Sequence, residues 1–164
     1  GTLYLEIMEN LPDVKAIIIM MNGGTGAAAA CIVAKIINPR VKVIGVQAEK
    51  APAVYLSWKN KRMIETKSAD TFAEGIATRV PFKFTLNILN KMIDDIIVVS
   101  DEEIEKAILT ILETTHQLAE GAGAASTAAA FKIREKLQGK KVVLVLTGGN
   151  LTLKDLSAIF REFY

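Results

Sequence analysis

Four short, continuous runs of apolar and β-branched residues are the feature that most constrains how this chain can fold. The runs are Val14–Met21, Val41–Val46, Asp95–Val99 and Lys141–Leu146. A short apolar run without polar alternation is typical of a strand that is buried on both faces, as in parallel sheets. Segments with helical patterns separate the runs. The alternation predicts an α/β fold, with a mainly parallel sheet flanked by helices on both faces.

The segments between the runs supply the predicted helices. Residues 26–37 are rich in alanine, which predicts a helix packed closely on the sheet in a right-handed βαβ unit. Ser100 and Glu103 have the spacing of a capping box. Residues 60–83 are polar and irregular, which predicts a long structured loop of the kind that is usually functional. Further helices are expected at residues 3–11, 51–59, 84–93, 101–118, 120–137 and 153–163.

Length and composition indicate one α/β domain that spans residues 1–164. The chain has 164 residues, 51% of them hydrophobic, and a net charge of +2 without a lysine or arginine block, so nucleic acid binding is not indicated. No run reaches the roughly 20 apolar residues that cross a membrane, and no signal peptide is visible. The single cysteine, Cys31, lies in an apolar helical stretch and is expected to be a buried thiol. We therefore expect a cytoplasmic protein.

Two glycine-rich turns follow predicted strands. Asn22–Gly26 comes after the first strand and Thr147–Asn150 after the fourth. Ligands of parallel sheets bind outside the carboxyl ends of the strands, where these turns are expected to meet. Each turn precedes a helix, whose N-terminal N–H groups attract anions, and glycine lets the backbone come close to them. The turns indicate a phosphate site; the other interpretation is a pair of tight strand–helix turns without a ligand.

The remaining polar residues give weaker signals. His116 falls at helical spacing, which favours a surface or packing role over catalysis. Glu120 lies among small residues and fits an acid at a helix N-terminus. Asp94, Asp95 and the acidic run Asp101–Glu103 are expected to be solvated charges. The sequence has no cysteine and histidine cluster with metal-binding spacing and no G-x-S-x-G nucleophile elbow.

One interpretation of the first turn is a dinucleotide site. Gly24–Ala29 fits G-x-G-x-x-A, and Glu49 lies 25 residues after Gly24, past the next strand. Alanine-rich helices satisfy the last position of that pattern easily. The match by itself is therefore weak support for a Rossmann-like nucleotide-binding module.

A second interpretation accounts for more of the chain. Several segments resemble, in the same order, the C-terminal half of the threonine/serine dehydratases, which are pyridoxal-phosphate enzymes of fold type II. The resemblance implies part of the large domain of that fold, pyridoxal 5'-phosphate as cofactor, and deamination of L-threonine or L-serine to a 2-oxo acid and ammonia. The segments are residues 1–19, 22–26, 38–53, 69–77, 94–104, 119–130 and 142–150.

The resemblance assigns the cofactor phosphate to the first turn. In the family, a loop of four glycines and an apolar residue holds this phosphate with backbone N–H groups. Here Gly23 and Gly24 match, Asn22 and Thr25 replace glycines, and Gly26 replaces the apolar residue. The Thr25 hydroxyl can add a donor to the phosphate.

The resemblance assigns the cofactor ring to the second turn. Thr147 stands where the family has a serine or cysteine facing the pyridine nitrogen, and Gly148 and Asn150 complete the turn. Glu120 matches the family's glutamate beside the ring. Some relatives bind a cation through carboxylates after the second strand, but the stretch 47–53 lacks that carboxylate pattern, so no metal is expected there.

The family's catalytic lysine, which forms a Schiff base with the cofactor, lies in the N-terminal half, and its motif does not occur in this sequence. The chain starts at Gly1 in an already helical pattern. We expect the C-terminal portion of a longer or two-chain enzyme, inactive alone, with the missing N-terminal half and a homo-oligomer as partners. A non-catalytic interaction or regulatory protein derived from the dehydratases is the remaining alternative, because the glycine loop is altered.

Overall fold

The computed structural model describes all residues from Gly1 to Tyr164 and contains one four-stranded sheet. Its strands are β1 (Ala16–Met20), β2 (Lys42–Ala48), β3 (Asp95–Val99) and β4 (Val142–Leu144). Every pair is parallel, and the order across the sheet is β3-β2-β1-β4. The predicted α/β class is confirmed. The fourth strand is shorter than predicted, because its pairing with β1 ends at Ile18 and Leu144.

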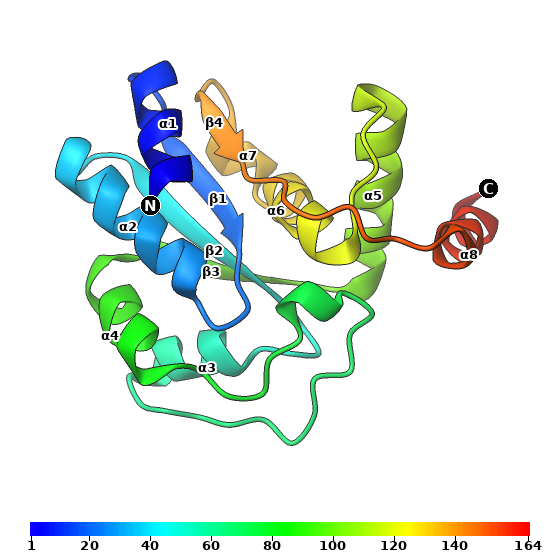
Figure 1. The fold of residues 1–164 in the computed structure, drawn as a ribbon, viewed down its shortest axis with the longest axis horizontal. Helices are drawn as coiled ribbons and strands as arrows, with labels where there is room; N and C mark the ends of the chain where they lie inside the picture. The colour runs from blue at the N-terminus through cyan, green and yellow to red at the C-terminus, as the bar shows by residue number, and fades with distance from the viewer.

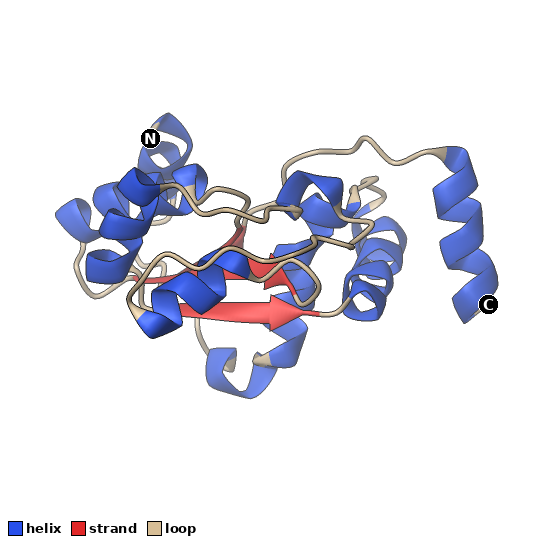
Figure 2. Cartoon of the chain, turned by 90° about the horizontal axis from the view of Figure 1, so that it is seen from below, coloured by secondary structure: helices blue, strands red, loops and turns tan.

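Helices cover both faces of the sheet (Figures 1 and 2). On one face, α1 (Thr2–Asn10), α2 (Thr25–Ile37) and α4 (Lys83–Met92) share a core with Ile17 and Ile19 of β1. On the other face, α5 (Asp101–Thr115) and α6 (Gly121–Lys132) share a second core with Ile18. Successive strand residues point to opposite faces, so the uninterrupted run Ile17–Ile19 supplies both cores.

The two inner helices owe their close packing on the sheet to small side chains. Ala27, Ala30 and Ala34 of α2 are fully buried, and so are Ala124, Ala125 and Ala129 of α6. A methyl group fills little space, so each helix lies close to the strands beneath it. This places the first turns of α2 and α6 near the carboxyl ends of the strands, where the glycine-rich turns lie.

The remaining elements are short or peripheral. They are α3 (Ala53–Asn60), a 3-10 turn η1 (Glu74–Ile76), α7 (Arg134–Leu137) and α8 (Leu153–Phe163). The helix expected at 101–118 ends at Thr115, because His116 adopts a left-handed conformation with φ 59°. The helix expected at 120–137 is divided at Ile133 into α6 and α7.

The capping box at Ser100 and the burial of Cys31 are confirmed. Burial raises the pKa of the Cys31 thiol to about 12.

Asp94 is not the solvated charge that the sequence suggested. Its carboxylate accepts hydrogen bonds from Lys35 at 2.6 Å, from Lys42 at 2.8 Å and from the Val43 N–H at 2.8 Å. Burial acts to raise the pKa of Asp94, but these hydrogen bonds outweigh it and hold that pKa below its usual value. The carboxylate therefore ties α2 to the sheet.

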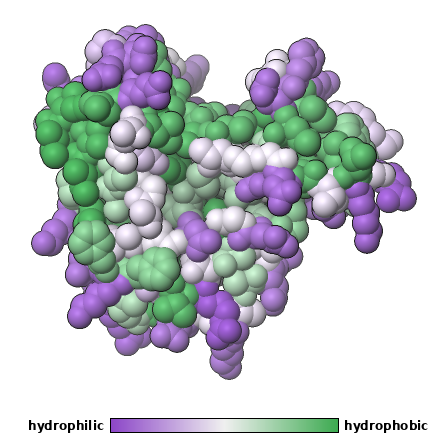
Figure 3. Space-filling model, in the orientation of Figure 1, coloured by the Kyte–Doolittle hydropathy of each residue, from purple (hydrophilic) through white to green (hydrophobic).

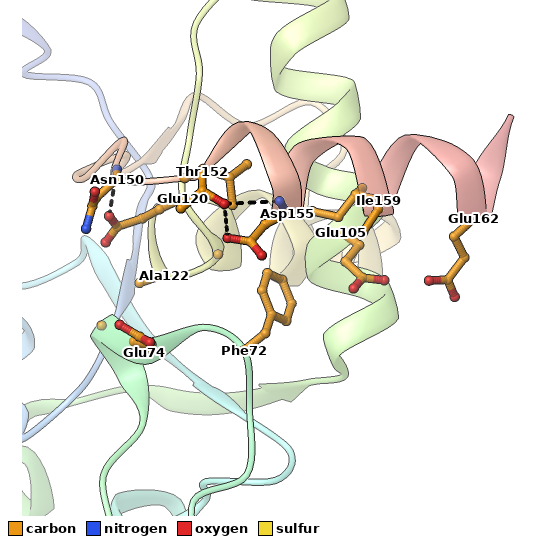
Figure 4. A pocket seen from close by; sticks show the side chains of 14 residues that line it. Phe72, Glu74, Glu105, Glu120, Ala122, Asn150, Thr152, Asp155, Ile159 and Glu162 are labelled. Carbon is orange, nitrogen blue, oxygen red and sulfur yellow. Dashed lines mark hydrogen bonds between the residues drawn. The ribbon is translucent and has the colours of Figure 1, made fainter.

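Asp101 is likewise bonded to other parts of the chain and is not a fully solvated charge. It accepts hydrogen bonds from Lys50 at 2.9 Å and from the Thr71 hydroxyl at 2.5 Å. The second contact fastens the predicted loop 60–83 to the start of α5. This loop contains only η1 as regular structure, and it carries Phe72 and Glu74 to the side of the molecule where α6 begins (Figure 4).

Three surfaces have few partners. The outer edge of β4 is free, and Leu144 and Leu146 are exposed. Helix α8 extends away from the rest of the chain and buries only Ile159 (Figure 1). Figure 3 shows hydrophobic side chains gathered over α1 and α2, where Leu3 and Ile36 are exposed. None of the helices is both long and apolar enough to cross a membrane.

Candidate functional site

The two glycine-rich turns lie at the carboxyl ends of neighbouring strands. The chain proceeds from β1 to β2 and β3 on one side, whereas β4 lies on the other side of β1. The order therefore reverses between β1 and β4, and such a switch point is where open α/β sheets bind ligands. The hydroxyl of Thr147 lies 3.7 Å from the sulfur of Met20, the last residue of β1. The structure thus places the second turn beside the end of the first strand.

The first turn presents a series of backbone N–H groups without backbone partners. Those of Asn22, Gly23 and Gly24 donate to no backbone carbonyl. Those of Thr25, Gly26 and Ala27 belong to the first turn of α2, where N–H groups lack partners within the helix. Gly24 is the N-cap of α2 with φ +86°, a left-handed conformation that favours glycine. Together with the helix dipole, these groups form a binding site suited to an anion.

The glycines of this turn also make room for α4. A Cβ at Gly23 would lie 2.2 Å from a ring carbon of Phe82, and one at Gly24 would lie 2.9 Å from Leu89. The buried Thr85 hydroxyl lies 2.5 Å from the Gly23 carbonyl oxygen and donates to it. Part of the glycine requirement is therefore internal packing, and the anion-binding assignment depends on the unpartnered N–H groups.

All three replacements in the loop face solvent. Asn22, Thr25 and Gly26 are exposed, whereas Gly23 and Gly24 are buried. Thr25 is the first residue of α2, so its hydroxyl stands beside the N–H groups of the helix terminus. The polar replacements thus occupy the open side of the turn, and the retained glycines occupy the side packed against α4.

The second turn is held against the start of α6. Gly148 has φ +89°, and a Cβ at Gly123 would lie 2.7 Å from the Thr147 carbonyl oxygen and 2.8 Å from that of Gly148. The Gly148 carbonyl also accepts from the Glu120 N–H at 3.2 Å. The N–H groups of Thr147, Gly148 and Gly149 donate to no backbone carbonyl. Gly123 therefore lets the turn lie directly on α6, and no motif in the sequence indicates this contact.

Glu120 connects α6 to the second turn. It is the N-cap residue of α6, as expected of an acid at a helix N-terminus, but its side chain makes no cap hydrogen bond. One carboxylate oxygen accepts from the Asn150 N–H at 3.0 Å, and a Cβ at Gly148 would lie 2.4 Å from the other oxygen. The structure thus brings Glu120, Gly148 and Asn150 together, as the sequence interpretation required. No hydrogen bond joins these residues to Asn22–Gly26.

A pocket of about 670 Å³ opens beside Glu120 and Asn150, toward α8 (Figure 4). No lysine or arginine lines it. Burial, and then the neighbouring Glu162, raise the pKa of Glu105 in this pocket above its usual value. The lining carboxylates would repel a phosphate, so the first turn is the better site for an anion. The lining carboxylates are Glu74, Glu105, Glu120, Asp155 and Glu162.

Gln47 occupies the stretch where some relatives of the resembled family bind a cation. Its side-chain oxygen accepts from the Tyr55 N–H at 2.8 Å and so satisfies one N–H group in the first turn of α3. Trp58 is half-buried and packs against the core shared with α2. His116 is exposed at the end of α5, in agreement with the expected surface or packing role.

Comparison with known proteins shows what the whole chain is similar to. A family model described as "Pyridoxal-phosphate dependent enzyme" matches residues 1–148. An L-threonine ammonia-lyase of Thermotoga maritima is 38% identical over 99% of this chain and 40% of its own length. A catabolic L-threonine dehydratase of Escherichia coli is 34% identical over 97% of this chain and 49% of its own length. The chain therefore spans less than half of these relatives.

Solved structures give the same result for the fold. The processed form of threonine deaminase isoform 2 from Solanum lycopersicum matches with a TM-score of 0.93 and 28% identity, over 98% of this chain and 48% of that one. Maize serine racemase matches with a TM-score of 0.89 and 27% identity, over 99% of this chain and 50% of that one. These similarities do not favour the dinucleotide interpretation of Gly24–Ala29, although the strand order is compatible with either.

Proposed function

Since this chain belongs to the family of pyridoxal-phosphate dependent enzymes, we propose that it forms the phosphate-binding side of an L-threonine or L-serine ammonia-lyase. The observation that carries the proposal is the first turn, Asn22–Gly26. It presents unpartnered N–H groups at the start of α2, at the switch point of the sheet. A phosphate bound there would accept several hydrogen bonds and interact favourably with the helix dipole.

The second turn would hold the other end of the cofactor. Thr147 presents an exposed hydroxyl that can donate to or accept from a ring nitrogen without changing its charge. Glu120 and Gly123 keep the turn in place from α6, and Asn150 presents its exposed side chain beside them. When bound, pyridoxal phosphate supplies the electron sink that a deamination requires. The residues of this chain bind and orient it.

The catalytic lysine and the remaining substrate contacts would come from a second portion of the enzyme. This chain spans 40% to 49% of its relatives, and the motif expected around that lysine does not occur in it. We propose that the chain is inactive alone and joins an N-terminal half that carries the lysine, within a cytoplasmic homo-oligomer. The free edge of β4, with exposed Leu144 and Leu146, supports a further covering element.

Reconstitution tests this proposal. The chain would be mixed with the segment that carries the lysine motif, from its own genome or from a relative, and titrated with pyridoxal phosphate. Borohydride reduction followed by peptide mapping should find the cofactor attached to the added segment and not to any lysine of this chain. Deamination of L-threonine or L-serine should require both parts. Attachment to this chain, or activity of this chain alone, would contradict the proposal.

The altered loop supports a second candidate, a non-catalytic protein derived from the dehydratases. Asn22 and Thr25 stand where the resembled family has glycines, and both are exposed at the open side of the turn. In that case the chain would bind neither inorganic phosphate nor pyridoxal phosphate, with or without the second segment. Calorimetric titration with both ligands separates the two candidates.

A further inference from the structure

We propose that Thr85 is a positioning residue for the anion-binding turn, an inference that relies on the function proposed above. Thr85 lies in α4, 62 residues away from Gly23 in sequence, and its side chain is buried. Its hydroxyl oxygen lies 2.5 Å from the Gly23 carbonyl oxygen and 3.0 Å from that of Phe82. A hydroxyl has a single proton to donate, and the shorter distance assigns it to Gly23.

The position of this carbonyl sets the direction of the next N–H group. The Gly23 carbonyl and the Gly24 N–H belong to one peptide unit, and the chain contains no cis peptide bond. In a trans unit the two groups point in opposite directions. When Thr85 holds the carbonyl toward α4, the Gly24 N–H points away from α4.

The turn has few other restraints. The N–H groups of Asn22, Gly23 and Gly24 make no backbone hydrogen bond, and Gly24 has the conformational freedom of glycine at φ +86°. The Phe82 ring packs where a Gly23 side chain would lie, but this ring is 60% exposed. The hydroxyl of Thr85 is therefore the directional contact that fixes the peptide, and it does so before a ligand arrives. Preorganised N–H groups bind an anion more tightly than groups that must first reorient.

Four variants of the 164-residue chain test this role. Thr85→Val removes the hydroxyl and keeps the shape, and Thr85→Ser keeps the hydroxyl. Thr115→Val is the matched control, because its hydroxyl donates to the Ile111 carbonyl at 2.7 Å in α5, away from the turn. If Thr85→Val does not fold, Thr85→Ala takes its place. Alanine and serine differ only in the hydroxyl group, so Thr85→Ala is then compared with Thr85→Ser.

Calorimetric titration with inorganic phosphate and with pyridoxal phosphate gives the first measurement. The loss of one neutral hydrogen bond predicts that Thr85→Val weakens both affinities about fivefold to tenfold. Thr85→Ser and Thr115→Val should stay within about twofold of the parent chain by the same reasoning. Thermal unfolding of each variant separates a loss of affinity from a loss of the fold.

The amide resonances in a ligand-free nitrogen–proton spectrum give the second measurement. In Thr85→Val the Gly24 signal should shift or broaden, whereas in Thr85→Ser it should remain close to its original position. A Thr85→Val chain that binds both ligands as tightly as the parent would overturn the inference alone. Equal losses in the serine and valine variants would do the same. If the parent chain binds neither phosphate nor the cofactor, the proposed function fails, and the positioning role fails with it.

Discussion

The two glycine-rich turns occupy equivalent places at the ends of adjacent strands but are held in different ways. The Asn22–Gly26 turn is fixed by a neutral hydroxyl, that of Thr85, which donates to a carbonyl. The Thr147–Asn150 turn is fixed by the Glu120 carboxylate, which accepts from the Asn150 N–H and lies against Gly148. The first turn keeps its N–H groups for a ligand, whereas the second gives one of them to a protein carboxylate.

This difference indicates which end of a cofactor each turn can hold. A phosphate is repelled by a nearby carboxylate and attracted by a helix N-terminus, so the proposed function places it at the first turn. An aromatic ring with one polar nitrogen has no phosphate charge for the Glu120 carboxylate to repel, and the Thr147 hydroxyl at the second turn offers that nitrogen a neutral partner. The charge of the residue that supports each turn therefore assigns its role better than glycine content, which both turns share.

The largest effect is expected from Gly24→Val. Valine at φ +86° is strained, and even its Cβ would approach Leu89 to 2.9 Å. We expect a loss of about 2 to 4 kcal/mol in the free energy of unfolding and a phosphate affinity lowered by more than about tenfold. Urea unfolding and calorimetric titration measure the two quantities.

Thr25→Gly is the control for that variant. Thr25 is exposed at the same helix terminus, and glycine restores the residue of the resembled family. Stability should change by less than about 1 kcal/mol, with a modest change in affinity. Equal tolerance of Gly24→Val and Thr25→Gly would remove the first turn from the site.

The next largest effect is expected from Gly123→Ala, which acts on the second turn. The added methyl group would meet the carbonyl oxygens of Thr147 and Gly148, at 2.7 Å and 2.8 Å. Since backbone atoms cannot move as freely as a side-chain end, we expect about 1 to 3 kcal/mol of destabilisation in urea unfolding. Inorganic phosphate should bind as before, and pyridoxal phosphate more weakly. Equal losses for both ligands would show that the turns do not act separately.

Much of the fold could be predicted from the sequence because its signals are local. The run Ile17–Ile19 feeds two cores, so its continuous hydrophobicity identifies a strand buried on both faces. The capping box at Ser100 and Glu103 is complete within four residues. The ends of helices were harder, since the stop at His116 depends on a left-handed residue that is not a glycine.

The site was only partly predictable, for the same reason. Glycines after strands indicated both turns, but the residues that hold them come from elsewhere in the chain. Thr85 is 62 residues from Gly23, and nothing around it in the sequence marks it. The pairing of Asp94 with Lys35 and Lys42 likewise arises only when α2 and β2 come together beside the start of β3. Contacts between distant segments carry no periodicity that a sequence pattern could display.

A smaller effect that separates the two turns is expected from Thr147→Val. The hydroxyl is exposed, and its one hydrogen bond within the chain is to the Met20 sulfur at 3.7 Å, so stability should change by less than about 0.5 kcal/mol. Affinity for pyridoxal phosphate should fall by about fivefold, while affinity for inorganic phosphate is unchanged, because phosphate alone does not reach this turn. Thr147→Ser should restore binding of the cofactor. A loss of inorganic phosphate binding would place Thr147 at the phosphate.

The smallest effect is expected from Glu120→Gln, and it examines the charge argument directly. Glutamine keeps an oxygen that can accept from the Asn150 N–H, so the turn should remain in place. Removal of the negative charge should raise the affinity for inorganic phosphate by no more than about twofold, since the two turns are separate and salt screens charges at the surface. Glu120→Ala should instead free the turn and cost about 1 kcal/mol in urea unfolding. Titrations at low and high salt give the decisive measurement: a large rise in phosphate affinity at low salt would mean that phosphate binds beside Glu120, and the assignment of the turns would be reversed.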